Sequence, residues 1–442
     1  MWHVGFGAPG GGRPTALAGA RPVGESARGP GFEMEQRAGE PRAARLTIAM
    51  LGTRGVPARY GGFETAVEEV GQRLASRGHD VRVYCREGPD APQPTQYKGM
   101  QLVWLPALHR RSMETLSHTG ASVAHLLAAP TDVAFVFNCA NAAWLPALRA
   151  ARIPVATHVD GLEWKRAKWG GAGRRYYRIA EAGAVRLSDA LIADAPGIAD
   201  YYREEFDAPT ELISYGSPVL CDVGSERLAE VGVRPQDYHL VVARLEPENH
   251  VDLMVDGFMR SRSPRQLVVV GSAPYADEYS ARVHALAGSD PRVRFLGGVW
   301  DQVLLDQLYA HAFTYLHGHS VGGTNPSLLR AIGVGTPCVA YDVSFNRDVL
   351  EDEGVYVGDR IAVTAAIEAA EADPVGTAAR GARLLERAKH YDWDEVADAY
   401  ENLAWALAEH HTPGPHRGGR RHHTRHLPMS ADPSPAHVGR RG

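Results

Sequence analysis

The sequence predicts an α/β protein with two parallel sheets, each covered by helices on both faces. Short apolar segments of strand type alternate regularly with amphipathic segments of helix type, and this alternation starts again after a polar connection. Regular alternation is typical of parallel sheets, because consecutive parallel strands need a crossover helix between them. With 442 residues the chain is long enough for two domains of this kind.

Composition divides the chain into five segments. Residues 1–44 are rich in Gly, Ala, Arg and Pro without an apolar period, so we expect a disordered N-terminal extension there. An N-terminal domain is expected at 45–214, a linker at 215–237 and a C-terminal domain at 238–410. The last segment, 411–442, is basic and rich in His, and we expect it to be a disordered tail.

Each domain shows its own series of expected strands. In the first domain they are 46–51, 81–84, 102–105, 133–137, 155–157 and 190–193, and in the second they are 240–242, 266–270, 293–295, 313–316 and 338–341. An amphipathic helix is expected at 64–76, after a Gly-rich loop that follows the first strand. A final helix at 394–409 carries apolar residues at helical spacing, so we expect it to pack back on the core.

Composition and charge argue against several classes of protein. A net charge of −5 is small for this length and does not favour bulk nucleic-acid binding. No apolar run approaches the length of a transmembrane helix, which is about 18 residues. The four cysteines are far apart and form no CxxC pair, which argues against a structural zinc site and fits a reducing cytoplasm.

Two strand ends in the second domain offer sites for an anion. The segment HGHSVGGTNPSLLRAIGVGTP, at 317–337, leaves a strand through a turn of small residues and enters a helix near Asn325. Backbone N–H groups and the positive end of a helix dipole are available at such a turn. Another strand carries a cation, Arg244, at its end. Because strand ends of one sheet lie at the same edge, we expect a nucleotide diphosphate site there.

The loop GTRGVPARYGGFE, at 52–64, also follows a strand and opens a helix. It does not match the dinucleotide fingerprint GxGxxG, since position 57 is Pro57, and no acid stands at a clear ribose position. An oxidoreductase is therefore disfavoured. Gly61 and Gly62 allow a ligand to approach the backbone, and the N–H groups before Glu64 are expected to point into the cleft. A turn that only connects strand and helix is the alternative.

Five motifs, in order along the chain, resemble those of one known family. They are GTRGVPARYGGFET at 52–65, DGLEWKRAKW at 160–169, LIADAPGIADYY at 191–202, VARLEPEN at 242–249 and GGTNPSLLRAIGVGTP at 322–337. Together they resemble the rhamnosyltransferase-like branch of glycosyltransferase family four, over residues 45–405. The resemblance implies the GT-B architecture, in which two Rossmann-like domains enclose a cleft and the C-terminal one binds a nucleotide-sugar donor. It also implies a retaining hexosyltransferase that uses no metal and no other cofactor.

The resemblance assigns the donor site residue by residue. Arg244 would contact the donor diphosphate, which suits its permanently charged guanidinium. Many members of the family carry Lys where this chain has Asn249, so more of the positive charge is left to Arg244. The other implied donor residues are Gly271, Val299, Gly322, Gly323, Thr324, Asn325 and Ser327. A surface ion pair with Glu246 or Glu248 is the alternative role for Arg244.

The largest departure from the family lies in 317–337. Relatives carry two glutamates there, and the corresponding positions of this chain are Ser320 and Arg330, which we also assign to the donor site. Exchanging Glu for Arg reverses the charge and removes an acceptor for the ribose hydroxyls. Either Arg330 contacts a different group and changes donor choice, or the chain is a non-catalytic relative that binds a nucleotide sugar.

The resemblance places catalytic and acceptor residues in the N-terminal domain. Asp160 stands where the family has a polar residue of the catalytic site, and His158, two residues earlier in a strand, would face the same side. Asp160 would orient the acceptor or support positive charge on the sugar ring. The donor phosphate would take the proton of the acceptor hydroxyl, while Arg244 stabilises the departing diphosphate. A purely structural His158 is the alternative.

A basic and aromatic stretch lies on the acceptor side. From Trp164 to Arg178 there are six cations, among them Lys165 and Arg166, and no acid. A polyprenyl-diphosphate-linked acceptor at the anionic inner face of the plasma membrane suits this pattern. Each basic residue near such a surface contributes about 1 kcal/mol, and Trp and Tyr prefer the interface. Base stacking on RNA and a solvated helix face are the alternatives.

Together these observations favour a cytoplasmic enzyme, peripheral to the membrane, that acts in cell-surface polysaccharide synthesis. It would move a hexose or deoxyhexose, with rhamnose suggested by the branch, from a nucleotide diphosphate sugar to a growing glycan or lipid-linked acceptor. A nucleotide-sugar-binding assembly protein is the main alternative. Phosphorolysis or epimerisation is a weaker one, since no lysine is placed for a pyridoxal cofactor.

Overall fold

The computed structural model describes residues 45–412, 414 and 416, apart from 59–60, 89–91, 109–112, 160, 167–168, 273–276 and 289. The expected disordered extension at 1–44 and nearly all of the expected tail at 411–442 lie outside the described residues. Asp160 lies outside them as well.

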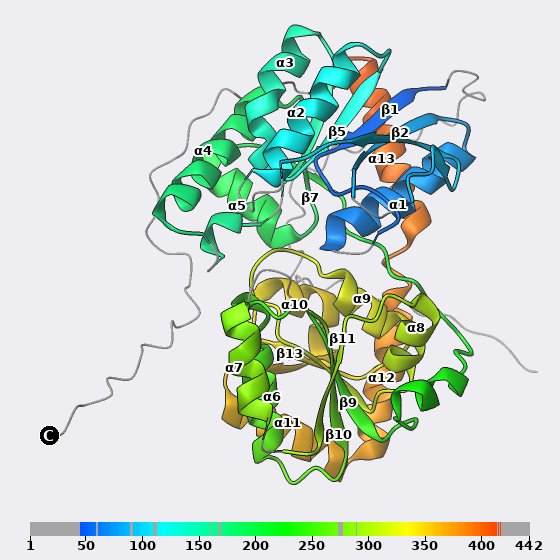
Figure 1. Cartoon of the computed structure of the whole chain (residues 1–442), viewed down its shortest axis with the longest axis vertical. Helices are drawn as coiled ribbons and strands as arrows, with labels where there is room; N and C mark the ends of the chain where they lie inside the picture. Colours follow the sequence, from blue (N-terminus) through cyan, green and yellow to red (C-terminus); the bar gives the residue numbers. More distant parts are fainter. Residues whose placement is uncertain are drawn as a thin grey trace, which may run out of the picture. The chain divides into compact units, whose positions relative to one another are not determined.

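Within the described residues the first half of the chain forms an eight-stranded sheet (Figure 1). The order is β3-β4-β2-β1-β5-β6-β7-β8, and among these strands only β3 is antiparallel to its neighbour. The strands are β1 Thr47–Leu51, β2 Asp80–Arg86, β3 Gln96–Tyr97, β4 Met100–Leu105, β5 Val133–Phe137, β6 Val155–Val159, β7 Ala190–Ala193 and β8 Glu211–Leu212. The strand order reverses between β1 and β5, which is the switch point of a doubly wound sheet.

In the second half, the described residues form a six-stranded parallel sheet in the order β11-β10-β9-β12-β13-β14. Its strands are β9 Tyr238–Val242, β10 Gln266–Val270, β11 Val293–Gly297, β12 Thr314–His317, β13 Cys338–Tyr341 and β14 Val355–Val357. The order reverses between β9 and β12. Arg244 follows β9 and the turn 318–325 follows β12, so both leave the sheet at its switch point.

The predicted fold class is confirmed, with two doubly wound parallel sheets. Three strands are not predicted by the sequence: β3, β8 and β14. They have two or three residues and lie at sheet edges, so no apolar period can reveal them. The first helix starts at Gly61 rather than at the predicted Glu64, so the glycine pair belongs to its first turn.

Helices cover both faces of the first sheet (Figure 1). On one face lie α1 Gly61–Ser76 and α13 Trp393–Ala408, and on the other α2 Glu114–Leu127, α3 Leu145–Ala150, α4 Gly171–Leu187 and α5 Pro196–Phe206. In β1, Ile48 and Met50 belong to the apolar cluster of α1 and α13, whereas Ala49 and Leu51 belong to that of α2–α5. All four are fully buried, as expected for a parallel strand covered on both sides.

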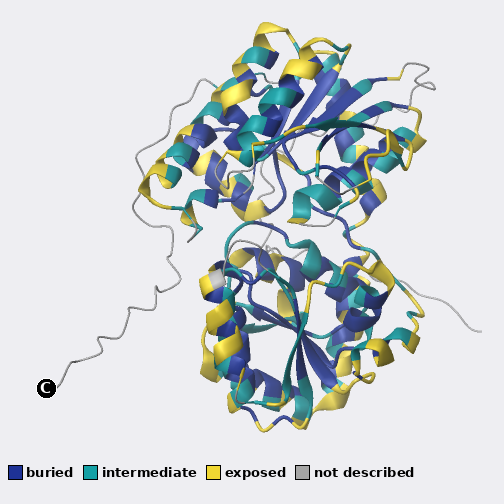
Figure 2. Ribbon diagram, viewed as in Figure 1, coloured by how far each residue is buried: buried dark blue, intermediate teal, exposed yellow. Residues whose placement is uncertain are grey.

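The second sheet is covered in the same way. One face packs against α6 Val251–Arg260, α7 Asp277–Ala287 and α11 Arg360–Ala372, and the other against α8 Gln302–Ala310, α9 Pro326–Gly333 and α12 Pro374–Ala388, with α10 Ser344–Leu350 at the carboxyl end of β13. Figure 2 shows the strands as a buried interior, with exposed residues on the outer sides of helices and in loops. None of the described helices is long and apolar enough to cross a membrane.

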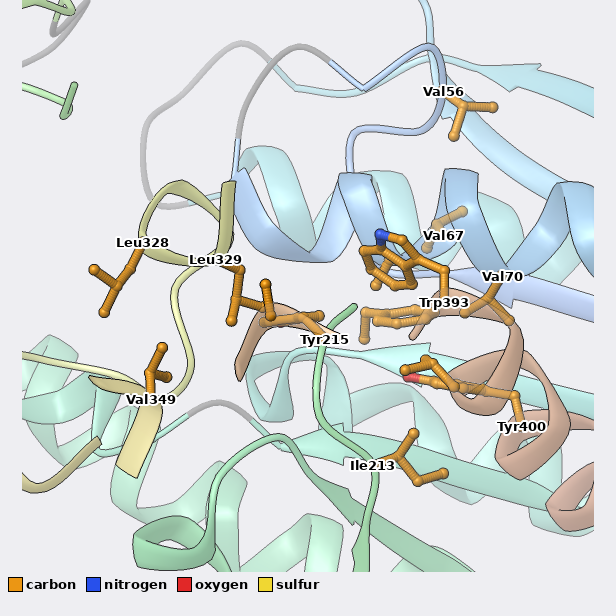
Figure 3. Packing of buried hydrophobic residues seen from close by; sticks show 14 of the residues in the cluster. Val56, Val67, Val70, Ile213, Tyr215, Leu328, Leu329, Val349, Trp393 and Tyr400 are labelled. Atoms are coloured by element: carbon orange, nitrogen blue, oxygen red, sulfur yellow. The ribbon is translucent and has the colours of Figure 1, made fainter. Parts of the chain in front are cut away.

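The last helix, α13, returns from the second half to pack on the first sheet beside α1. Arg77, which directly follows α1, pairs with Asp398 at 2.6 Å and with Glu401 at 2.7 Å. Trp393 and Tyr400 of α13 join the apolar cluster that also contains the α1 residues labelled in Figure 3. The predicted packing of this helix on the core is confirmed.

Replacing Tyr400 by Phe is expected to lower the free energy of unfolding by about 1–3 kcal/mol. The Tyr400 hydroxyl forms a 2.8 Å hydrogen bond with Nδ1 of His158, and both side chains are buried. The variant would leave that ring nitrogen without its partner in an apolar surrounding. The midpoint of urea unfolding would measure the loss. Tyr356→Phe is the matched control, since the Tyr356 hydroxyl donates to the carbonyl of Glu351 near the surface. Equal midpoints for Tyr400→Phe and the unaltered protein would contradict the expectation.

Candidate functional site

A cavity of about 1150 Å³ lies at the carboxyl ends of strands from both sheets. Residues that follow β5, β6, β7, β9, β10 and β12 line it: Asn138, Gly161, Asp194, Ala243, Gly271 and Gly318. Ligands of doubly wound sheets bind beyond the carboxyl ends of the strands, and pockets of this size take extended organic molecules. The two halves therefore share one candidate site.

Most of the predicted donor residues line this cavity. They are Arg244, Asn249, Gly271, Val299, Gly322, Gly323, Thr324, Asn325, Ser327 and Arg330. Ser320 is not a lining residue. Its hydroxyl donates to the carbonyl oxygen of Glu248 at 3.0 Å and lies 3.0 Å from Nε2 of His250. In this structure Ser320 therefore stabilises the turn and does not face the cavity.

Arg244 is held in place by its own turn. Its side chain is 41% exposed, and Nη1 lies 3.5 Å from Oε2 of Glu246. The side-chain amide of Asn249 donates to the backbone oxygen of Arg244 at 2.8 Å, and its oxygen lies 2.7 Å from Nδ1 of His319. Asn249 thus fixes the backbone that presents Arg244, while Arg244 keeps an accessible charge.

The turn before α9 is built by side-chain hydrogen bonds. Asn325 caps the helix, since its Oδ1 accepts from the Ser327 N–H at 2.9 Å. The Ser327 hydroxyl donates to the backbone oxygen of Val242 at 3.1 Å, which ties α9 to the end of β9. The positive end of the α9 dipole and Arg244 therefore border the same cavity, an arrangement that favours an anion.

Arg330 lines the cavity from the last turn of α9, but its charge is already matched. It forms an ion pair with Asp306 of α8. Asp306 also accepts a hydrogen bond from Gln302 at 3.0 Å. The cavity wall thus carries an ion-paired arginine where the family resemblance led us to expect a glutamate.

On the opposite wall the structure places Gly61, Gly62, Glu64 and Arg166, four of the five predicted acceptor residues. The Glu64 carboxylate accepts from the backbone N–H of Arg54 at 3.0 Å, and burial raises its pKa. The fifth, Lys165, is not a lining residue; its ammonium lies 5.6 Å from the centre of the Trp164 ring.

His158 is buried beside the cavity and does not line it. Its ring contacts Phe63 and Tyr215, which do line the cavity, with ring centres 5.0 and 5.9 Å away. Burial lowers the pKa of His158 to about 3, so the ring is neutral near pH 7. Its position supports the structural alternative, in which His158 and Tyr400 together form a buried polar contact.

The glycine pair of the second half touches the first half directly. A Cβ atom at Gly323 would lie 1.9 Å from Oδ1 of Asp194, and one at Gly161 would lie 2.8 Å from the carbonyl oxygen of Gly322. The Thr324 hydroxyl donates to the backbone oxygen of Asp194 at 2.8 Å. These positions therefore need glycine because the two halves meet there.

Comparison with known families assigns one domain to each half. Residues 61–216 match the family described as glycosyl transferase 4-like domain, and residues 236–384 match the family described as glycosyl transferases group 1. Together the two matches cover more than half of the chain, and they place it among the glycosyltransferases. The boundary between the two matches falls between β8 and β9, where the first sheet ends and the second begins.

One relative and two solved structures are similar to this chain. The glycosyltransferase is 26% identical over 178 residues to the O-antigen chain mannosyltransferase B of Escherichia coli, a match that covers 38% of this chain and 46% of that one. The matched segment thus spans less than half of the relative. Sucrose-phosphate synthase from Thermosynechococcus elongatus has the same fold, with a TM-score of 0.71, 20% identity and coverage of 83% of this chain and 100% of that chain. HepE of Anabaena, solved with UDP-glucose, has a TM-score of 0.66, 16% identity and coverage of 82% and 100%.

Sequence reasoning missed several residues of this glycosyltransferase that border the cavity. Asp194 follows β7, Glu163 follows β6 and Tyr215 follows β8, and all three are lining residues. Asp194 lies within a motif that the sequence singled out, and an acid directly after an apolar strand is a usable signal for a site. Glu163 and Tyr215 carry no comparable signal, since they stand four and three residues beyond the ends of β6 and β8.

Acid is expected to destabilise this glycosyltransferase through three buried histidines. Burial lowers the pKa of His158 and of His317 to about 3 and that of His118 to about 4. Below the unfolded pKa of about 6.5 the unfolded chain binds protons that the folded chain does not. The free energy of unfolding therefore falls as the pH is lowered, by up to about 1.4 kcal/mol per pH unit and histidine.

Urea midpoints measured between about pH 7.5 and 5.5 would test this expectation. The variant His118→Leu lacks one of the three groups and should show a shallower fall. A midpoint that does not change over this range would contradict it.

Proposed function

We propose that this glycosyltransferase transfers a hexose or deoxyhexose from a nucleotide diphosphate sugar to a glycan or lipid-linked acceptor. The observation that carries the proposal is the shared cavity, in which Arg244 and the N-terminus of α9 lie in one wall and Gly61 and Gly62 in the other. A guanidinium and a helix N-terminus favour a diphosphate. Similar structures of HepE were solved with UDP and with UDP-glucose, which supports a donor of this class.

In the proposed reaction the bond between the anomeric carbon and the diphosphate oxygen breaks, and a bond to the acceptor oxygen forms on the same face of the sugar. The acceptor proton passes to an oxygen of the departing diphosphate, whose charge Arg244 and α9 stabilise. Asp160 orients the acceptor or supports positive charge on the sugar, and Glu64 borders the acceptor side. Positioning and charge stabilisation carry this mechanism, and neither a protein nucleophile nor a metal takes part.

Cell-surface polysaccharide synthesis is the proposed setting. The matched Escherichia coli relative is an O-antigen chain mannosyltransferase, so mannose joins rhamnose among the donor sugars to test. The exposed side of α4 carries Arg174, Arg175, Ile179 and Arg186. A basic side with an apolar residue suits an anionic membrane surface, where a polyprenyl-diphosphate-linked acceptor would be presented.

A thermal-shift screen without added metal tests the donor site first. The ligands are UDP, GDP and dTDP and their hexose and deoxyhexose conjugates, including mannose and rhamnose. A ligand present at about 100 times its dissociation constant stabilises the fold by about 2.7 kcal/mol. We expect one nucleotide to raise the melting temperature selectively, and more strongly with one of its sugars. No response to any of these ligands would refute the donor assignment.

A non-catalytic nucleotide-sugar-binding protein is the second candidate. The ion pair of Arg330 with Asp306 favours it, since this wall offers an arginine that is already paired instead of a glutamate for the ribose. The double variant Arg330→Glu with Asp306→Asn restores the acid without placing two carboxylates together. Transfer that appears only in this variant would support the second candidate, whereas transfer by the unaltered protein would exclude it.

A further inference from the structure

We propose that Arg166 of the first half and Arg244 of the second half form a clamp for one diphosphate, with Glu246 occupying the place of the anion between them. The inference deepens the proposed function and rests on it, because it assigns the second cation of the donor site. It also moves Arg166 from the acceptor side, where the sequence placed it, to the donor diphosphate.

The geometry of the two arginines carries this inference. Oε2 of Glu246 lies 3.5 Å from Nη1 of Arg244 and 4.0 Å from Nη1 of Arg166. The two guanidinium nitrogens are therefore at most about 7.5 Å apart, a span that one diphosphate can bridge. Both arginines line the cavity.

Arg166 also reaches the small-residue turn that precedes α9. A Cβ atom at Gly322 would lie 3.9 Å from Nη2 of Arg166. Burial is the chief cause that lowers the pKa of His319, and the charges of Arg166 and Arg244 lower it further. Both positive charges are therefore close to this side of the cavity. The Arg166 guanidinium thus stands beside the glycine turn, and an anion seated at this turn would meet both arginines.

The need for a second cation follows from position 249. Asn249 brings no charge, and its amide is engaged with the backbone of Arg244 and with His319. Arg166 is only 12% exposed and pairs with Glu248 at 3.3 Å and with Glu163. Glu248 directly precedes Asn249. Arg166 of the first half therefore places a positive charge near Asn249, the position at which many members of the family carry Lys.

A carboxylate that pairs with a phosphate-binding arginine competes with the phosphate for the guanidinium. Glu246 contacts both arginines and is the more exposed of the two acids, with 19% exposure against 3% for Glu248. An incoming diphosphate carries more charge than one carboxylate and offers more acceptor oxygens. We therefore assign Glu246 as the carboxylate that the diphosphate displaces. Glu248 and Glu163 hold Arg166 in position.

The test compares binding of a nucleoside diphosphate with binding of the monophosphate of the same base, with no acceptor present. Arg166→Gln should weaken the diphosphate about 10- to 100-fold and the monophosphate much less, because a charge-assisted double contact is lost. Arg166→Lys, which keeps the charge without the fork, should lie between. The matched control is Arg203→Gln, which removes an exposed, ion-paired arginine of the first half.

Glu246→Gln should change affinity in the opposite direction. Removing the competing carboxylate should strengthen diphosphate binding about 3- to 10-fold, while melting temperatures without ligand show that each variant is folded. Weaker binding in Glu246→Gln would overturn the stand-in role. Unchanged diphosphate binding in Arg166→Gln, together with a raised KM for the acceptor, would return Arg166 to the acceptor side and overturn the clamp.

Failure of the proposed function can be told apart from failure of the clamp. If no nucleoside diphosphate binds the unaltered protein, the donor assignment fails, and inorganic pyrophosphate becomes the probe. Pyrophosphate binding that Arg166→Gln and Arg244→Gln both abolish would still support the clamp. Binding that neither variant changes, or no binding at all, would overturn it.

Discussion

Replacing Arg244 by Ala is expected to weaken donor binding about 10- to 100-fold, because the guanidinium contributes charge-assisted hydrogen bonds to the diphosphate that are stronger than neutral ones. Its side chain is 41% exposed at the cavity, so its removal should leave the stability of the unliganded protein nearly unchanged. Titration of the best nucleoside diphosphate, followed by calorimetry or by the thermal shift, would measure the loss.

The control for this experiment is Arg203→Ala. Arg203 is 68% exposed and pairs with Asp200 on the surface of the first half, so it matches the change in charge without touching the cavity. Its donor affinity should equal that of the unaltered protein. Equal affinity in Arg244→Ala would mean that the diphosphate lies elsewhere, and it would refute the donor site on which the proposed function rests.

Replacing Gly323 by Ala is expected to reduce kcat/KM about 100-fold or more, since a misplacement of about 1 Å in a reacting complex can cost that much. The new Cβ would lie 1.9 Å from Oδ1 of Asp194 and 2.7 Å from Cδ1 of Ile198. Asp194 is short and only 5% exposed, so its carboxylate has little room to move. The two halves could then no longer approach as closely as they do in this structure.

Steady-state kinetics and donor titration together would test this prediction. Most of the loss should appear in kcat, because the obstructed contact is made with the other half of the protein. Gly358→Ala is the matched control, since no atom lies within 4 Å of a Cβ built there. Normal turnover in Gly323→Ala would show that the contact between Gly323 and Asp194 is not needed for the reaction.

Local patterns predicted much of the fold and part of the site. The apolar runs that became β5, β7, β10 and β13 have the predicted bounds, because a strand buried on both faces must be apolar throughout. The helix after the second glycine turn was predicted from Asn325, which caps α9. Arg244 was predicted to be a donor-site residue from its place at the end of a strand, and it lines the cavity.

Contacts between the halves could not be predicted in this way. The sequence suggested that His158 faces the cleft, yet its ring lies against Tyr400, 242 residues further along the chain. Arg166 was assigned to the acceptor, yet it pairs with Glu248 of the other half. Such contacts depend on how two sheets and a returning helix pack together. The hydrophobic periodicity of a short segment carries no information about that packing.

The sequence by itself determined the fold class and the strand ends that carry the charged and small residues of the site, because hydrophobic periodicity and turn chemistry act over a few residues. Only the tertiary structure decided that Asp194 meets Gly323, that Arg330 is neutralised by Asp306, and that Arg166 and Arg244 share Glu246. Each of these pairs joins segments distant in the chain, and their proximity arises from the packing of whole elements, to which many residues contribute.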